Sequence, residues 1–124
     1  MTEKEKMLAG IAYSAVDAQL LEELNTVKEI IHRYNSLSPS CTGERLSILK
    51  GLLGNIADDE IIVNQPFYCD YGKQISVGKR FFANFNLTIL DEARVTIGAG
   101  SVVTRDIPDN VVAVGNPCKV IKSV

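Results

Sequence analysis

Histidine and cysteine are the residues of this chain best suited to proton transfer, nucleophilic attack or zinc binding. The 124 residues include one histidine, His32, and three cysteines, Cys41, Cys69 and Cys118. Zinc ligands usually come in pairs about two to five residues apart, whereas no two cysteines are close and His32 lies nine positions from Cys41. We therefore expect no metal site. The odd number and wide spacing of the cysteines favour reduced thiols in the cytoplasm over a disulfide framework.

The first half of the chain has the pattern of helices. Thr2 and Glu5 fit a capping box, Asp17 is a candidate N-cap, and Thr42 is a candidate cap for a further helix. Apolar residues at three- and four-residue spacing give the middle helix one buried stripe; they are Leu20, Leu24, Val27, Ile31 and Tyr34. His32 falls beside this stripe, so we interpret it as a solvated surface residue rather than a general base.

The second half has short apolar runs separated mostly by Gly, Asn, Asp or Pro. The runs are residues 61–63, 67–69, 75–77, 87–90, 95–97, 102–103 and 111–114. Inward aliphatic candidates recur every sixth position at Val77, Ala83 and Ile89, and again at Ile97 and Val103. Short strands with regular corners and a six-residue period predict a triangular solenoid rather than a sandwich.

Seven runs resemble the maltose/galactoside O-acetyltransferase family of the hexapeptide-repeat superfamily, in the family's order and over nearly the whole chain. They are residues 7–10 with Tyr13, 66–72, 75–78, 82–86, 98–104, 106–108 and 115–117. The resemblance implies a mainly β fold, with an N-terminal helical segment over residues 1–58 and a shortened left-handed parallel β-helix with a tail over residues 59–124. It also implies transfer of an acetyl group from acetyl-CoA to a sugar hydroxyl, in enzymes that are usually homotrimers.

One part of the family pattern is missing. In relatives, further hexapeptide coils and a loop with the catalytic histidine would follow Gly98, but here Gly98 joins Ala99 directly. Ile97 and Val103 stay six apart across the join, so the missing part is a whole number of repeats. Acetyl transfer to an alcohol needs a base for the hydroxyl proton. We therefore expect little or no transferase activity. The alternative is a non-catalytic structural module, a minimal β-helix that oligomerises.

The resemblance also assigns candidate binding residues. Asn84, with Asp91 or Glu92 nearby, matches the positions that contact the sugar acceptor, although Asn84 also suits a solenoid corner because asparagine tolerates left-handed backbone geometry. The candidate acetyl-CoA contacts are Ala99, Thr104, Arg105, Lys119 and Lys122. Donors and positive charge suit phosphate, while the alternative for the three basic residues is a solvated surface role.

Charge and hydropathy limit the other partners. The 13 Lys and Arg against 15 Asp and Glu give a net charge of −2, which argues against nucleic-acid binding. No apolar run is long enough for a membrane span, and the charged N-terminus is unlike a signal peptide, so we expect a cytoplasmic protein. A solenoid this short leaves apolar ends. We expect a homo-oligomer, with a trimer first and a swapped or stacked assembly second.

Overall fold

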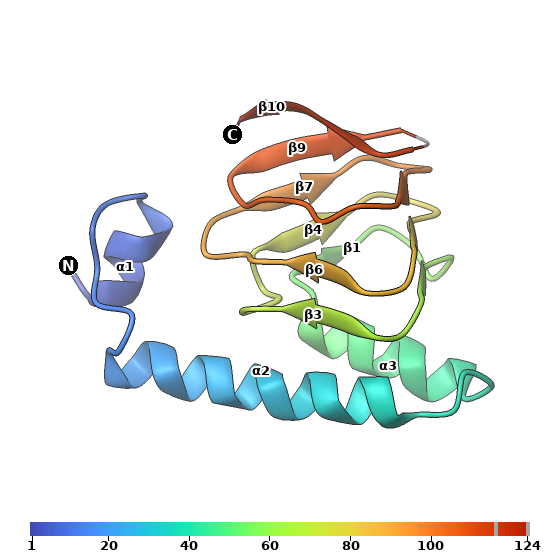
Figure 1. Cartoon of the computed structure of the whole chain (residues 1–124), viewed down its shortest axis with the longest axis horizontal. Coiled ribbons are helices and arrows are strands. Elements are labelled where there is room, and N and C mark those ends of the chain that lie inside the picture. The colour runs from blue at the N-terminus through green and yellow to red at the C-terminus, as the bar shows by residue number, and fades with distance from the viewer. Residues whose placement is uncertain (116, 124) are drawn as a thin grey trace.

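The computed structural model describes residues 1–115 and 117–123, which form three helices followed by ten short strands (Figure 1). The helices are α1 (Glu3–Leu8), α2 (Ala18–Ser36) and α3 (Thr42–Leu52). The strands are β1 (Asn55–Ile56), β2 (Ile62–Val63), β3 (Phe67–Cys69), β4 (Ile75–Val77), β5 (Phe82–Ala83), β6 (Leu87–Ile89), β7 (Val95–Ile97), β8 (Val102–Val103), β9 (Val111–Val114) and β10 (Lys119–Ser123). Among the described residues, no helix has the length and apolar character needed to cross a membrane.

Two of the three predicted helix caps are confirmed. The Thr2 hydroxyl accepts from the Glu5 amide, and the Glu5 carboxylate accepts from the Thr2 amide, each at 3.0 Å. The Asp17 carboxylate accepts from the Leu20 amide at 3.2 Å and begins α2. The prediction for Thr42 was wrong, because Cys41 occupies the N-cap of α3 without a side-chain hydrogen bond and Thr42 is the first helical residue.

The strands wind into a three-sided coil. Each strand pairs in parallel with a strand of the next turn, which gives three ladders: β1-β4-β7-β9, β2-β5-β8 and β3-β6. A parallel bridge from Ile89 to Ile107 extends the third ladder by one step. The fold is therefore mainly β with an N-terminal helical segment, as predicted.

The predicted six-residue period marks the interior of the coil. Val77, Ala83, Ile89, Ile97 and Val103 are each no more than 2% exposed. Side chains in a strand point alternately to its two faces, and the strands that carry these residues alternate buried and less buried positions. The core of the coil is therefore a stack of aliphatic side chains, one from each short side of the triangle.

The two ends of the coil are covered differently. Helices α2 and α3 lie across one end, near β1 and β3, and strands β9 and β10 lie at the other (Figure 1). β10 is antiparallel to β9, and all five of its residues are exposed. The division of the chain at residue 58 stays a prediction; β1 precedes that position and already pairs with β4 of the coil.

The ladders cross the join between Gly98 and Ala99 without a change of interval. Ile62 pairs with Phe82, and Phe82 pairs with Val102, so the interval is 20 residues on both sides of Phe82 although only the second includes the join. The Gly78 amide also donates to the Ile97 carbonyl at 2.7 Å, and the Gly98 amide to the Ala113 carbonyl at 2.8 Å. The coil thus closes around the join with paired backbone groups.

Candidate functional site

Asn84 lies between β5 and β6 and is half-buried. Its amide donates to the Val103 carbonyl at 2.9 Å. The left-handed residue of this corner is Asn86, with φ of 64°, whereas Asn84 is not among the residues with positive φ. The corner geometry therefore does not require asparagine at position 84, which removes one structural reason for its presence there.

Asp91 is fully buried and faces the interior of the corner between β6 and β7. Its carboxylate accepts hydrogen bonds from the backbone amides of Asp70, Tyr71 and Gln74, at 3.1, 2.9 and 3.3 Å. Burial raises the pKa of Asp91 to about 6, while these amide donors oppose the shift. Both carboxylate oxygens are engaged with the chain itself, so a sugar contact at this position depends on the neighbouring Glu92.

Glu92 is exposed and lies close to other ionisable groups from distant parts of the chain. Burial raises the pKa of Asp70, and the negative charge of Glu92 and a hydrogen bond with it raise it further. Burial and Glu92 likewise raise the pKa of Tyr13. Glu92 and Tyr13 line a cleft of about 450 Å³ between the segment after α1 and the corner that contains Asp109. Sequence reasoning missed Tyr13, Asp70 and Asp109 as neighbours of Glu92, because the coil brings them together.

The predicted sugar contacts do not share a corner. Asn84 precedes β6 and Glu92 follows it, so the three residues of that strand lie between their corners. Within one chain, the two side chains flank one short side of the coil. A ligand that touches both therefore extends along the outer face of β6.

The predicted coenzyme contacts lie around β8 and on β10, and all five are exposed. Ala99 is at the corner before β8, and Thr104 and Arg105 follow β8 at the next corner. Lys119 pairs with Val114 and Lys122 with Val112 of β9. The close approach of Gly98 to Val114 places the corner of Ala99 near the Lys119 end of β10. The structure thus puts Ala99 and Lys119 at one end of β8 and Arg105 at the other, while Asn116 of the 115–117 run lies outside the described residues.

His32 is an exposed residue of α2, as the sequence predicted. It borders a groove of about 420 Å³ between α2 and the coil, together with Tyr68 and Asp70. Because α2 lies at the end of the coil opposite β9 and β10 (Figure 1), His32 is remote from the strand that carries Lys119 and Lys122.

A six-residue inward period, three parallel ladders and small residues at the corners define a hexapeptide-repeat protein. A family model described as "Maltose acetyltransferase hexapeptide capping motif" matches residues 6–57. A putative acetyltransferase of Saccharomyces cerevisiae is 34% identical, over 97% of this chain and 92% of the yeast protein. The chain belongs to the maltose/galactoside acetyltransferase family of hexapeptide-repeat proteins.

Solved structures of the same family have the same fold. A maltose O-acetyltransferase from Clostridium difficile is 33% identical, with a TM-score of 0.74 over 100% of this chain and 98% of that one. A galactoside acetyltransferase solved in complex with coenzyme A is 27% identical, with a TM-score of 0.72 over 99% of this chain and 91% of that one.

The alignment with the yeast protein also bears on the missing coils. It extends over 181 positions, while this chain has 124 residues, so at least 57 positions (181 minus 124) have no residue of this chain opposite them. The chain is therefore a shorter version of a longer family pattern, although its ends match those of the relative closely.

Proposed function

We propose that this chain is a shortened left-handed β-helix derived from an acetyl-CoA-dependent sugar O-acetyltransferase, with little or no acetyl-transfer activity of its own. The observation that carries the proposal is the unchanged 20-residue interval of the ladder across Gly98 and Ala99. A coil that closes there has no room for the additional turns and the histidine-bearing loop that the family resemblance implies. What remains is the scaffold without its proton acceptor.

The chemistry supports low activity. A positioned base typically accelerates transfer to an alcohol by about a hundred- to ten-thousand-fold. The single histidine lies on α2, beneath the coil, and is exposed. The buried carboxylate of Asp91 is occupied by backbone amides and is not free to accept a proton from a sugar hydroxyl.

An acetyl-transfer assay tests the proposal. Release of free CoA from acetyl-CoA is followed in the presence of maltose, galactosides and glucosamine derivatives, beside a full-length relative. We expect turnover at least about a hundredfold below that of the relative, and no change in the residual rate on His32→Ala. Turnover equal to that of the relative, abolished by His32→Ala, contradicts the proposal.

Ligand binding is proposed to outlast catalysis. Asn84 and Glu92 are the candidate sugar contacts, and Ala99, Thr104, Arg105, Lys119 and Lys122 are the candidate contacts of the coenzyme. Calorimetry with CoA checks the second set. We expect weak binding that Arg105→Ala reduces and that His32→Ala does not change. No heat at millimolar CoA eliminates the coenzyme part of the proposal.

The second candidate function is that of an assembly module, supported by the exposed apolar residues of the open end. Val120 and Ile121 on β10 are 47% and 58% exposed, and Phe85 at a coil corner is 68% exposed. Isolated exposed apolar residues are ordinary, but a strand edge that carries two of them favours association. Light scattering should give the mass of a trimer or of a stacked assembly. The mass of one chain at micromolar concentration contradicts this role.

A further inference from the structure

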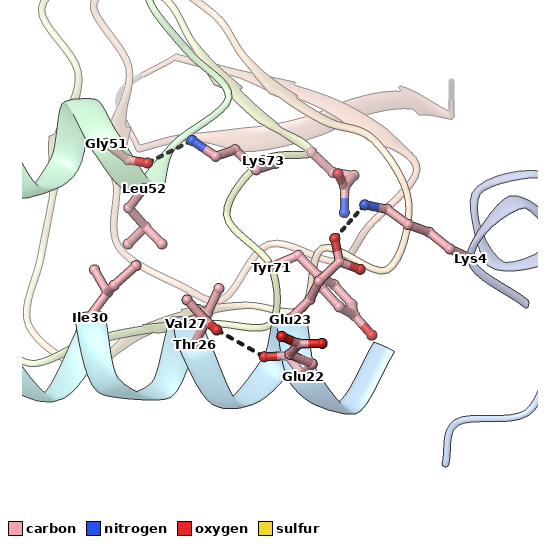
Figure 2. A pocket seen from close by; sticks show the side chains of 11 residues that line it. Lys4, Glu22, Glu23, Thr26, Val27, Ile30, Gly51, Leu52, Tyr71 and Lys73 are labelled. Carbon is pink, nitrogen blue, oxygen red and sulfur yellow. Dashed lines mark hydrogen bonds and ion pairs between the residues drawn. The ribbon is translucent and has the colours of Figure 1, made fainter. Parts of the chain in front are cut away.

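A cavity of about 280 Å³ lies where the N-terminal helices meet the coil. Figure 2 shows its walls, which come from α1, α2, the end of α3 and the corner of residues 71–74. None of the predicted sugar or coenzyme contacts lines it. It is thus separate from the surfaces discussed above, and its occupation does not depend on the proposed function.

One wall of the cavity is apolar. Val27 and Ile30 of α2 face Leu52 at the end of α3, and the ring of Tyr71 lies beside them (Figure 2). Small-molecule sites are typically lined by apolar side chains, with a few polar groups that fix the ligand's orientation. This wall favours a ligand with an aliphatic body.

The polar side of the cavity lacks a hydrogen-bond donor. Oxygen Oε1 of Glu23 accepts from the Lys4 ammonium at 2.5 Å. Its other oxygen, Oε2, is shielded from solvent and has no hydrogen-bond partner among the described residues. Glu22 lies next to Glu23 (Figure 2) and forms no ion pair within the part of the chain that the structure describes. A buried acceptor without a donor is costly, so this side of the cavity is suited to a ligand that donates.

The second lysine of the lining does not supply that donor. The Lys73 ammonium donates to the Gly51 carbonyl at 2.6 Å, near the end of α3 (Figure 2). Lysine is favourable there, because the last carbonyls of a helix carry partial negative charge. Lys73 is therefore held near one end of the cavity, and the Glu22 and Glu23 carboxylates remain near α1.

We propose that this cavity binds a small primary amine with an aliphatic chain. The ammonium donates to Glu23 Oε2 and to the Glu22 carboxylate, and the chain lies against Val27, Ile30 and Leu52. An ammonium has three donors, and its hydrogen bonds to a carboxylate are stronger than those of a neutral hydroxyl. The site therefore discriminates against an alcohol of the same length.

The test uses the intact chain and three six-carbon probes: n-hexylamine, 1-hexanol and hexanoate. Titrations are followed at pH 7 by backbone amide NMR, where the amine carries its proton. We expect saturable shifts at residues of α2 and of the 71–74 corner with the amine. The alcohol should bind at least about tenfold more weakly, and hexanoate should produce no saturable shifts. Equal shifts with all three probes, or none with the amine at millimolar concentration, overturn the proposal.

Three substitutions sharpen the test. Glu23→Gln should weaken amine binding about tenfold, since it removes the charge that receives the ammonium. Glu29→Gln is the matched control on the same helix, outside the cavity lining, and should change nothing. Thr26→Trp places a large side chain from an exposed position at the cavity and should abolish binding. Circular dichroism verifies that each variant is folded, and unchanged amine affinity in folded Glu23→Gln overturns the proposal.

Discussion

The helical segment and the coil are built from hydrogen bonds of different range. In the helices, the capping side chains lie three residues from the amides that they accept, as with Thr2 and Glu5. At the corners of the coil, aspartates accept from amides 17 to 22 residues away: Asp58 from Arg80, Asp91 from residues 70, 71 and 74, and Asp106 from Thr88. The helices are therefore specified locally, while the coil depends on each turn having the next one in place.

The glycines show the same difference. A Cβ added at Gly43 of α3 meets nothing within 4 Å, whereas one at Gly78 lies 2.4 Å from the Ala99 backbone nitrogen. Gly78 belongs to the turn before the join, and Ala99 is the first residue after it. The close backbone contact across the join is thus part of the structure that a shortened coil needs.

The largest expected effect is at the junction of the two regions. Leu52 ends α3, is 2% exposed and packs beside the corner that contains Gly72. Leu52→Ala should lower the free energy of unfolding by about 3 kcal/mol, through lost apolar contact and an enlarged cavity. Urea unfolding at fixed protein concentration measures it.

Leu90→Ala is the control for this substitution, because it removes the same atoms from a coil residue that is 52% exposed. We expect a change of less than about 0.5 kcal/mol. If both variants lose the same stability, the helices are not an essential cover for the coil, and the comparison between the regions fails.

The next effect concerns the coil alone. Gly78→Ala should destabilise by about 2 kcal/mol, because the new methyl group meets backbone at the join and the two turns must separate. Hydrogen exchange should show faster exchange at the Gly78 and Gly98 amides, which pair across this region. Unchanged stability and exchange contradict a tight contact between the turns.

A smaller effect depends on pH at the corner that Asp91 holds. Its pKa of about 6 in the folded chain is above the ordinary 3.8, so the folded state binds the proton more tightly than the unfolded state. This contribution to stability is complete below about pH 4 and is lost as the pH rises through 6, by about 2 kcal/mol. The difference between the chain and Asp91→Asn, measured from pH 4 to 8, isolates it from the neighbouring Asp70. A difference that does not vary with pH contradicts the assignment.

The sequence predicts the local features well. The strands at 67–69, 75–77, 95–97, 102–103 and 111–114 have the predicted bounds, because alternation and corner residues mark them locally. β1 was missed, and residues 54 and 55 were interpreted only as the end of a helix. Its strand character comes from pairing with β4, 21 residues further on. Pairing at that distance leaves no mark in a two-residue segment.

The candidate site divides in the same way. Family resemblance supplied Asn84 and the pair Asp91 and Glu92, but not which carboxylate faces outward. Strand alternation contains that signal: Ile89 is buried, Leu90 is exposed, Asp91 is buried and Glu92 is exposed. The approach of Tyr13 and Asp109 to Glu92 carries no such signal, since it depends on how α1 and the next turn pack around the corner.

The smallest expected effect has the opposite sign and tests the helical half of the comparison. Gly43→Ala should stabilise the chain by about 0.5 kcal/mol, because alanine loses less backbone entropy than glycine in a helix and its methyl group meets no neighbour. Thermal unfolding beside Gly78→Ala gives the two signs in one experiment. A glycine is replaceable where the backbone is specified by its own neighbours in sequence, and required where a second turn of the chain passes within contact distance. If Gly43→Ala destabilises the chain, α3 is held by the coil rather than by its own sequence, and the separation of local from long-range specification does not apply to that helix.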